Sequence, residues 1–200
     1  RIRLELQGVS CLALEEVPAP KKGIASAKSF GKPVESLQEL EEALSTYTAR
    51  AAEKLRSGQL LAGQVHVFLT TNPFATRQPQ YNAGAQTALA RPSNHTPDLI
   101  AAALRLLREI YRHGHQYKKT GIFLTDLMAE SDLQPDLFEA TPGAGRVKEL
   151  DRIVDGLNRK LGRNAIRYGS MGVKQGWAMR QDRRSKKFTT RWDELPVAKA

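Results

Sequence analysis

Few residue patterns in this 200-residue sequence could support catalysis or metal binding. His113 and His115 flank Gly114 where a predicted helix ends, and there a cationic ring favours the helix dipole more readily than it binds a metal. Asp193 and Glu194 form an acidic pair in a basic tail, where solvated carboxylates or local salt bridges are the simpler interpretation. The sequence has no Walker-type glycine-rich loop and no Cys-x-x-Cys motif. It therefore argues against a complete enzyme, and no cofactor is expected in this chain.

Another pattern, Q-P-D-L-F-E at residues 134–139, is suited to binding rather than to catalysis. Leu137 and Phe138 stand beside a proline and acidic residues, in a stretch without the helical or alternating period that would bury them. An exposed apolar pair of this kind usually marks a contact with another molecule. Two interpretations stay open: a docking peptide for a partner, or two side chains that tuck under the helix that follows.

Positive charge is concentrated in the last third of the chain. Residues 1–140 carry 16 lysines and arginines against 15 acidic residues, and residues 141–200 carry 15 against 6. The net charge of +10 thus divides into +1 and +9. This asymmetry predicts a partner that bears phosphates, either nucleic acid or an anionic membrane surface, with a merely soluble basic tail as the alternative.

The remaining composition bears on the compartment. Cys11 is the only cysteine, so no disulfide can form within the chain, which favours a reducing compartment. No run approaches 18 consecutive apolar residues, and no signal-peptide pattern opens the sequence. A cytoplasmic protein without a membrane partner is predicted. Because the sequence starts at Arg1 without an initiator methionine, we expect it to be a piece of a longer chain.

Periodicity and chain breakers divide residues 23–128 into six elements. These are a strand within 23–34, a helix at 36–58, strands at 60–71 and 81–90, a helix at 96–111 and a strand at 117–128. Ser36 and Glu39 match a capping box, and Thr96 is expected to cap the second helix. The order predicts a split βαβ (βαββαβ) unit, in which both helices cover one face of a four-stranded sheet and the other face is free to bind.

Beyond residue 140 the pattern changes. A loop at 141–145 leads into a predicted helix at 146–161, whose apolar residues recur at helical spacing. From about residue 164 basic and aromatic residues interleave without a clear period. The predicted fold class is therefore α+β, a split βαβ domain followed by a small basic C-terminal region with one helix.

Five ordered stretches carry a family resemblance: K-S-F-G at 28–31, Y-T-A-R-A-A-E-K-L-R at 47–56, T-N-P-F at 71–74, Y-K-K-T-G-I-F-L-T-D-L at 117–127 and F-T-T-R-W-D-E-L-P at 188–196. Together they resemble the C-terminal half of the UmuC-type polymerases, which are Y-family translesion DNA polymerases. The resemblance implies four regions: the end of the thumb and a linker (1–22), the DNA-binding little finger (23–130), a linker with a clamp-binding peptide (131–145) and a basic C-terminal region (146–200).

The family's catalytic palm has no counterpart in this sequence. Its metal-binding carboxylates, which include a Ser-x-Asp-Glu motif, find no match, and the acidic pair at 193–194 stands in the wrong context to replace them. We therefore do not expect this chain alone to polymerise DNA. Mg²⁺ is expected only in the palm of the parent polymerase.

The resemblance also implies site residues. Gln134, Leu137 and Phe138 fit the family's Gln-x-x-Leu-Phe pentapeptide, which docks on the sliding clamp. Leu and Phe would fill an apolar cleft, and the Gln amide would bond at its edge. Contacts to the DNA backbone are expected from one sheet face formed by neighbouring central strands, at Lys28, Ser29, Gly31, Tyr117, Lys118 and Lys119. Such contacts would hold primer-template DNA without reading its sequence.

The predicted function is the DNA-binding and clamp-tethering portion of an error-prone polymerase that acts in SOS repair and mutagenesis. In this family the extreme C-terminus is implicated in contacts with a UmuD-type accessory subunit and with RecA, so the tail could instead be a platform for these proteins. An RNA-binding protein of the ribosomal type is a further alternative, but residues 65–71 lack the aromatic motif of an RNA-recognition sheet.

Overall fold

The computed structural model describes residues 1–12, 20–134, 144–179 and 185–196. Its helices and strands, in chain order, are α1 (Ile2–Leu6), β1 (Ile24–Val34), α2 (Leu37–Ser57), β2 (Leu60–Thr71), β3 (Asn82–Ser93), α3 (Thr96–Ile110), β4 (Tyr117–Ala129) and α4 (Ala144–Leu161). Single 3₁₀ turns occur at Glu130–Asp132 (η1), Gly169–Met171 (η2) and Trp192–Glu194 (η3).

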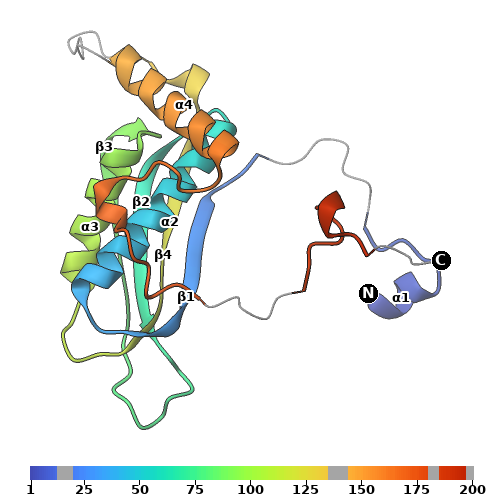
Figure 1. Cartoon of the computed structure of the whole chain (residues 1–200), viewed down its shortest axis with the longest axis horizontal. Helices are drawn as coiled ribbons and strands as arrows, with labels where there is room; N and C mark the ends of the chain where they lie inside the picture. The colour runs from blue at the N-terminus through green and yellow to red at the C-terminus, as the bar shows by residue number, and fades with distance from the viewer. Residues whose placement is uncertain (13–19, 135–143, 180–184, 197–200) are drawn as a thin grey trace.

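The four strands form one antiparallel sheet in the order β1-β4-β2-β3, and α2 and α3 cover one of its faces (Figure 1). This arrangement confirms the predicted α+β fold with a βαββαβ order. β4 and β2 are the inner strands, so β1 is an edge strand rather than the central strand that was expected. The pairing of β1 with its neighbour β4 is as predicted.

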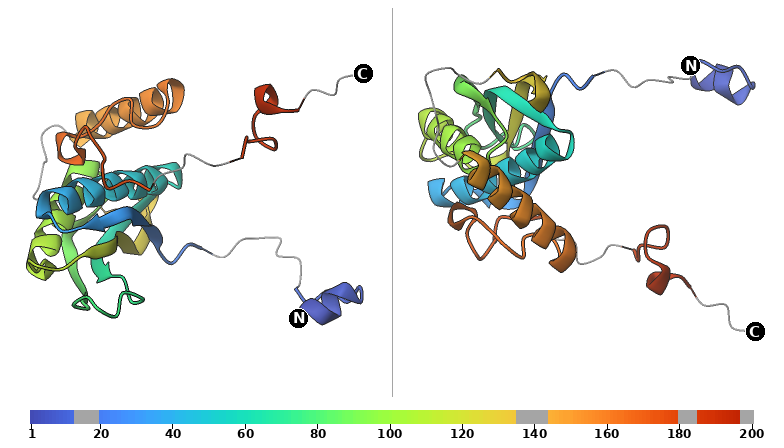
Figure 2. Two further views of the ribbon diagram at one scale, coloured as in Figure 1. Left: turned by 60° about the horizontal axis from the view of Figure 1, so that its bottom comes forward. Right: turned by 90° about the horizontal axis from the view of Figure 1, so that it is seen from above.

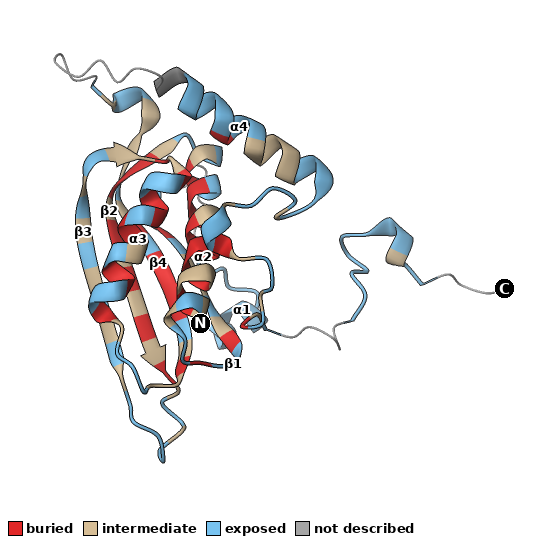
Figure 3. Ribbon diagram, turned by 60° about the vertical axis from the view of Figure 1, so that its left-hand side comes forward, coloured by how far each residue is buried: buried red, intermediate tan, exposed pale blue. Residues whose placement is uncertain are grey.

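The core lies between the sheet and the two helices (Figure 3). Alternate residues of β2 and the inward stripes of α2 and α3 are fully buried, as their periods of two and about 3.6 require. Leu44 of α2, Val67 of β2 and Leu107 of α3 are examples, each with no exposed surface. Burying a side chain of this size contributes roughly 1.5–3 kcal/mol.

The helix caps differ from the prediction. Ser36 does precede α2, but its side chain makes no capping hydrogen bond, so the expected capping box is wrong. α3 takes His95 rather than Thr96 as its N-cap residue. The Thr96 hydroxyl instead accepts a hydrogen bond from the Arg56 guanidinium at 2.9 Å. The Thr96 side chain thus makes a tertiary contact with α2 in place of the helix cap that the sequence suggested.

The C-terminal region packs on the helix side of the sheet, where Figure 2 shows α4 lying over α2. After η2 the chain runs back along α2 to the end of β1, and Trp177 is almost fully buried there. Its ring makes edge contacts with Phe30 and Tyr47 at centroid distances of 6.3 and 5.8 Å. Residues far apart in the sequence thus share one core, and Phe30 belongs to it as predicted.

Tyr47 makes the stability of this core sensitive to alkaline pH. Burial raises the pKa of its phenol from 10.0 to about 12, although nearby Arg50 opposes the shift. Because the folded pKa lies above the unfolded value, the contribution of Tyr47 is fully present below about pH 10 and is lost as the pH rises towards 12. We expect the melting temperature to fall between pH 9 and pH 11, and to fall less for Tyr47→Phe. Equal drops in both proteins would contradict this assignment.

Candidate nucleic-acid interface

Among the residues that the structure describes, no helix covers the sheet face opposite α2 and α3, and aromatic side chains lie along this face. Val65 and Val67 of β2 are fully buried on the core side, so His66 and Phe68 take the other face. Phe123 of β4 pairs with His66 across the ladder and is 40% exposed. We call the surface around these three aromatic residues the open face.

Two glycines leave room for the aromatic rings to lie against the backbone of the open face. A Cβ at Gly121 would lie 2.8 Å from Phe68 Cε1, and one at Gly84 would lie 2.9 Å from His66 Nε2. The rings of His66 and Phe68 therefore rest over glycine backbone, 5.7 and 5.6 Å from the ring centroid of Phe123. The outcome is an aromatic floor in which the Phe123 ring is tilted by 38° to each of the other two rings.

Two of the predicted DNA-binding residues adjoin this floor. Ser29 and Lys119 pair with each other across the β1–β4 ladder, so their side chains share the open face. The Lys119 ammonium lies 5.5 Å from the ring centroid of Phe68, within the range of a cation–π contact. An ammonium and a hydroxyl beside an aromatic surface can contact phosphate oxygens and sugars without reading bases.

Lys28 does not lie on the open face, contrary to the prediction. It pairs with Thr120, which is fully buried on the helix side of the sheet. Its charged neighbours are Arg50 of α2 and Arg163. Arg50, partial burial and Arg163, in that order, lower the pKa of the Lys28 ammonium. The strand alternation that places Ser29 on the open face therefore turns Lys28 to the opposite side, towards these arginines.

Tyr117 and Lys118 also differ from the expected exposed strand start. Tyr117 is fully buried, and its hydroxyl donates to the Arg112 carbonyl at 2.7 Å. The register between β2 and β4 shifts at this point, and the shift turns Tyr117 to the core side. The Lys118 ammonium donates to the Phe30 carbonyl at 3.0 Å. The predicted set of three lysines on one sheet face is thus wrong, and Lys119 alone of the three is there.

Gly31 has a structural role that the sequence did not reveal. Its N–H donates to the Trp177 carbonyl at 3.1 Å, so the amide expected to meet a phosphate is already bonded within the chain. A Cβ here would lie 2.6 Å from the Ala178 carbonyl oxygen. Glycine is needed at this position because the C-terminal segment approaches the backbone so closely.

The predicted clamp-binding peptide begins just past the sheet. β4 ends at Ala129, η1 follows, and Gln134 is exposed. Leu137 and Phe138 lie outside the described residues. The assignment of this peptide therefore stays a prediction that depends on the sequence pattern.

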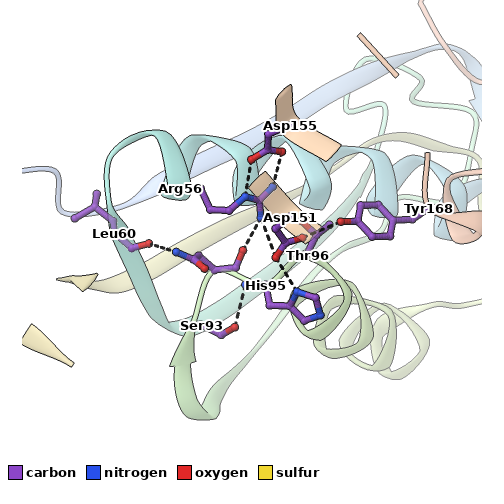
Figure 4. A network of polar contacts seen from close by, with 9 residues as sticks. Arg56, Leu60, Ser93, His95, Thr96, Asp151, Asp155 and Tyr168 are labelled. Atoms are coloured by element: carbon purple, nitrogen blue, oxygen red, sulfur yellow. Dashed lines mark hydrogen bonds and ion pairs between the residues drawn. The ribbon is translucent and has the colours of Figure 1, made fainter. Parts of the chain in front are cut away.

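A polar network holds α4 against the sheet domain (Figure 4). Arg56, at the end of α2, donates to both carboxylate oxygens of Asp155 at 2.7 and 2.8 Å. Asp151 lies 2.7 Å from His95 Nδ1 and accepts from the Tyr168 hydroxyl at 3.0 Å. Burial alone would lower the pKa of Arg56, but the bond to Asp155 and the charges of both aspartates outweigh it and raise that pKa.

Part of the apolar stripe of α4 does not make this contact. Leu150 is 58% exposed and Leu161 is 71% exposed, whereas Asp151 is almost fully buried. The helix predicted from its apolar period is present, but its acidic side chains face the sheet domain. This leaves apolar surface on α4 free for a partner.

The other candidate groups are explained by their surroundings. The His115 ring lies against Tyr81, with centroids 5.1 Å apart. Glu194 bonds to the Lys187 N–H and to Arg191, and these contacts, the N–H first, lower the pKa of its carboxyl. In the parts of the chain that the structure describes, no group of three or more His, Cys, Asp or Glu residues could hold a metal ion. No helix there is both long enough and apolar enough to cross a membrane.

The aromatic residues of the open face were absent from the predicted site. A signal for two of them was present, because successive residues of a strand point to opposite faces, which puts His66 and Phe68 opposite Val65 and Val67. Phe123 stands between two apolar neighbours, so its period is less clear. These three residues are now the centre of the candidate interface.

Comparisons with known proteins cover nearly the whole chain. Residues 21–137 match the family model of the impB/mucB/samB family C-terminal domain, and residues 148–198 match a domain of unknown function (DUF4113). SamB of Salmonella typhimurium is 37% identical over 195 residues, which cover 98% of this chain and 46% of that protein. MucB of Escherichia coli is 37% identical, with coverages of 97% and 46%. UmuC of Salmonella typhimurium is 37% identical, with coverages of 96% and 45%. The chain spans slightly less than half the length of these relatives.

Solved structures give weaker matches. The little finger domain of PolIV, in a complex with the beta-clamp processivity factor, is 18% identical with a TM-score of 0.42, covering 58% of this chain and 99% of that one. DinB from Sulfolobus solfataricus is 11% identical with a TM-score of 0.44, covering 54% of this chain and 29% of that one. At such low identity the likeness is one of fold alone.

Proposed function

Since this chain belongs to the impB/mucB/samB family, as its resemblance to UmuC-type proteins implied, we propose that it is the DNA-holding and clamp-tethering part of a translesion polymerase. The parent protein would act in SOS repair and mutagenesis, and its catalytic palm with Mg²⁺ would lie in another part of that protein. The observation that carries the proposal is the open face with Ser29 and Lys119 at its side, within the residues matched to the family.

The open face suits the backbone of duplex DNA. Lys119 would pair with a phosphate, the Ser29 hydroxyl would donate to a phosphate oxygen, and Phe123 would pack against deoxyribose. None of these contacts distinguishes one base from another. A polymerase that copies damaged templates needs such indifference, because the bases beside a lesion vary.

The clamp proposal is independent of the open face. It depends on the match of Gln134, Leu137 and Phe138 to the pentapeptide, and on its position shortly after β4. A clamp encircles DNA, so even a weak contact would raise the local concentration of this chain at the primer end.

Protein partners remain a second candidate function. The exposed apolar side of α4, with Leu150 and Leu161, favours a contact of the C-terminal region with a UmuD-type subunit or with RecA. RNA is the less favoured ligand because the family match concerns polymerase-type proteins.

The Lys119 ammonium is expected to neutralise one phosphate of a bound duplex. Lys119→Ala should therefore flatten the slope of log affinity against log salt by about 0.9. Fluorescence anisotropy with a labelled duplex at several salt concentrations measures that slope. Lys160→Ala, which removes an exposed lysine of α4, is the matched control and should leave it unchanged. The open face is not the duplex site if both variants give the wild-type slope.

A further inference from the structure

A cleft of about 1030 Å³ lies on the helix side of the edge strand β1. β1, α2 and the stretch from α4 to η2 provide its walls, so the C-terminal region is needed to form it. Three of the lining cations come from three separate parts of the chain: Lys28 from β1, Arg50 from α2, and Arg163 from the turn after α4. We call this the basic cleft.

These three cations lack counter-charges. Among the residues that the structure describes, Lys28, Arg50 and Arg163 make no ion pair or hydrogen bond. Two other cations that line the cleft are paired, because Arg56 is bonded to Asp155 and Lys148 is bonded to Glu130.

The pKa of Lys28 reflects repulsion among these three cations. Arg50 contributes most to lowering the pKa of this ammonium, followed by burial and by Arg163. Glu53 also lines the cleft, but it forms no ion pair with any of the three. Like charges held together without a partner destabilise the protein, and a bound anion would remove that cost.

We propose that the basic cleft binds the phosphate backbone of single-stranded DNA. Arginine forks match phosphate geometry, and a groove with cations on opposite walls follows a strand rather than a single ion. A volume near the upper end of small-ligand pockets, roughly 300–1,000 Å³, fits a few nucleotides of one strand but not a duplex. Tyr168 adds an aromatic side chain to the lining.

The basic cleft and the open face are separate sites that meet at β1. Ala27 pairs with Gly121 on the open face and also lines the cleft, so the cleft reaches around the sheet edge. A template strand that leaves a duplex on the open face could continue there. DNA suits the cleft better than an acidic peptide does, because its charges recur at every nucleotide. This inference adds a single-strand site to the proposed function and uses a different surface.

The test compares the affinity of the full chain for single-stranded DNA with its affinity for duplex DNA. Anisotropy is measured with labelled oligo(dT) of 12 nucleotides and with a 12-base-pair duplex, for wild type and for Arg50→Ala/Arg163→Ala. We expect the double variant to lose about tenfold in oligo(dT) affinity per arginine, and its salt slope to flatten by about 1.4. Duplex affinity should change less than twofold, because the duplex site lies on the open face.

A matched control removes the same charge elsewhere. Arg146→Ala/Lys160→Ala takes two exposed cations from α4 that do not line the cleft. An equal loss of oligo(dT) affinity in this control would show that net charge alone acts, and would overturn the site. Oligoglutamate that displaces oligo(dT) at equal charge would overturn the assignment to nucleic acid.

An experiment on the wild-type chain avoids any effect of substitution on folding. An amine-reactive reagent should modify Lys28 readily, and bound oligo(dT) should protect it in peptide mass spectra. Unchanged modification of Lys28 at saturating oligo(dT) would overturn the proposal. A failure of the proposed duplex site would give a different result. The chain would then not bind the duplex through the open face, but oligo(dT) would still protect Lys28 from modification.

Discussion

Replacing Leu137 and Phe138 by alanine is expected to abolish detectable binding to the sliding clamp while leaving the melting temperature nearly unchanged. Both residues follow the sheet domain and belong to the Gln-x-x-Leu-Phe pattern. Burying each side chain in a partner's cleft would contribute roughly 1.5–3 kcal/mol, so losing both would weaken the complex about a hundredfold or more. A contact of micromolar affinity would then escape ordinary detection.

Titration calorimetry with purified clamp measures this loss. Leu133→Ala is the matched control, since it truncates a leucine just outside the pentapeptide and should keep clamp affinity within about twofold. The sequence left open a second interpretation, in which Leu137 and Phe138 pack under α4. A double variant that melts several degrees lower and still binds the clamp would favour that interpretation.

Replacing Trp177 by alanine is expected to destabilise the whole sheet domain. The side chain is 3% exposed and fills the space between Phe30 and Tyr47. Core truncations of this kind cost about 3–5 kcal/mol. For a chain of this size the melting temperature should therefore fall by about 10 °C or more. Thermal unfolding followed by circular dichroism measures the change.

Two further variants test whether the loss of stability in Trp177→Ala comes from the buried ring. Trp192 is 89% exposed, so Trp192→Ala should melt with the wild type. Trp177→Phe keeps an aromatic ring and removes a buried indole N–H that has no acceptor among the described residues, so it should retain most of the stability. Equal melting of wild type and Trp177→Ala would mean that the segment around Trp177 is not part of the cooperative fold.

The sequence predicted the elements of the sheet domain well because each one buries a periodic face. The alternating valines of β2 and the leucine stripe of α2 are examples in which burial and period agree. The capping box failed because a cap contributes only about 1 kcal/mol, which other contacts can replace. The edge position of β1 was not predicted, since strand order depends on contacts distant in sequence.

The candidate site was harder to predict than the fold. A register shift at the start of β4 turns Tyr117 to the core side, and the local sequence has no marker for it. The partner of Arg56 is Asp155, 99 residues away, and nothing near either residue indicates the pair. The basic and aromatic tail suggested nucleic-acid binding, yet it supplies Trp177 to the core.

The close approach of Gly31 to Ala178 limits which parts of this chain can be replaced by the matching parts of a relative. By sequence the chain divides into two matched parts, with the break between residues 137 and 148. The Gly31 N–H and the ring of Phe30 nevertheless meet the backbone and ring of Trp177, which lies across that break. A hybrid gene that joined the first part of one relative to the second part of another would have to preserve this seam. The two parts are therefore separable as sequence, but the residues on the two sides of this contact have to match each other.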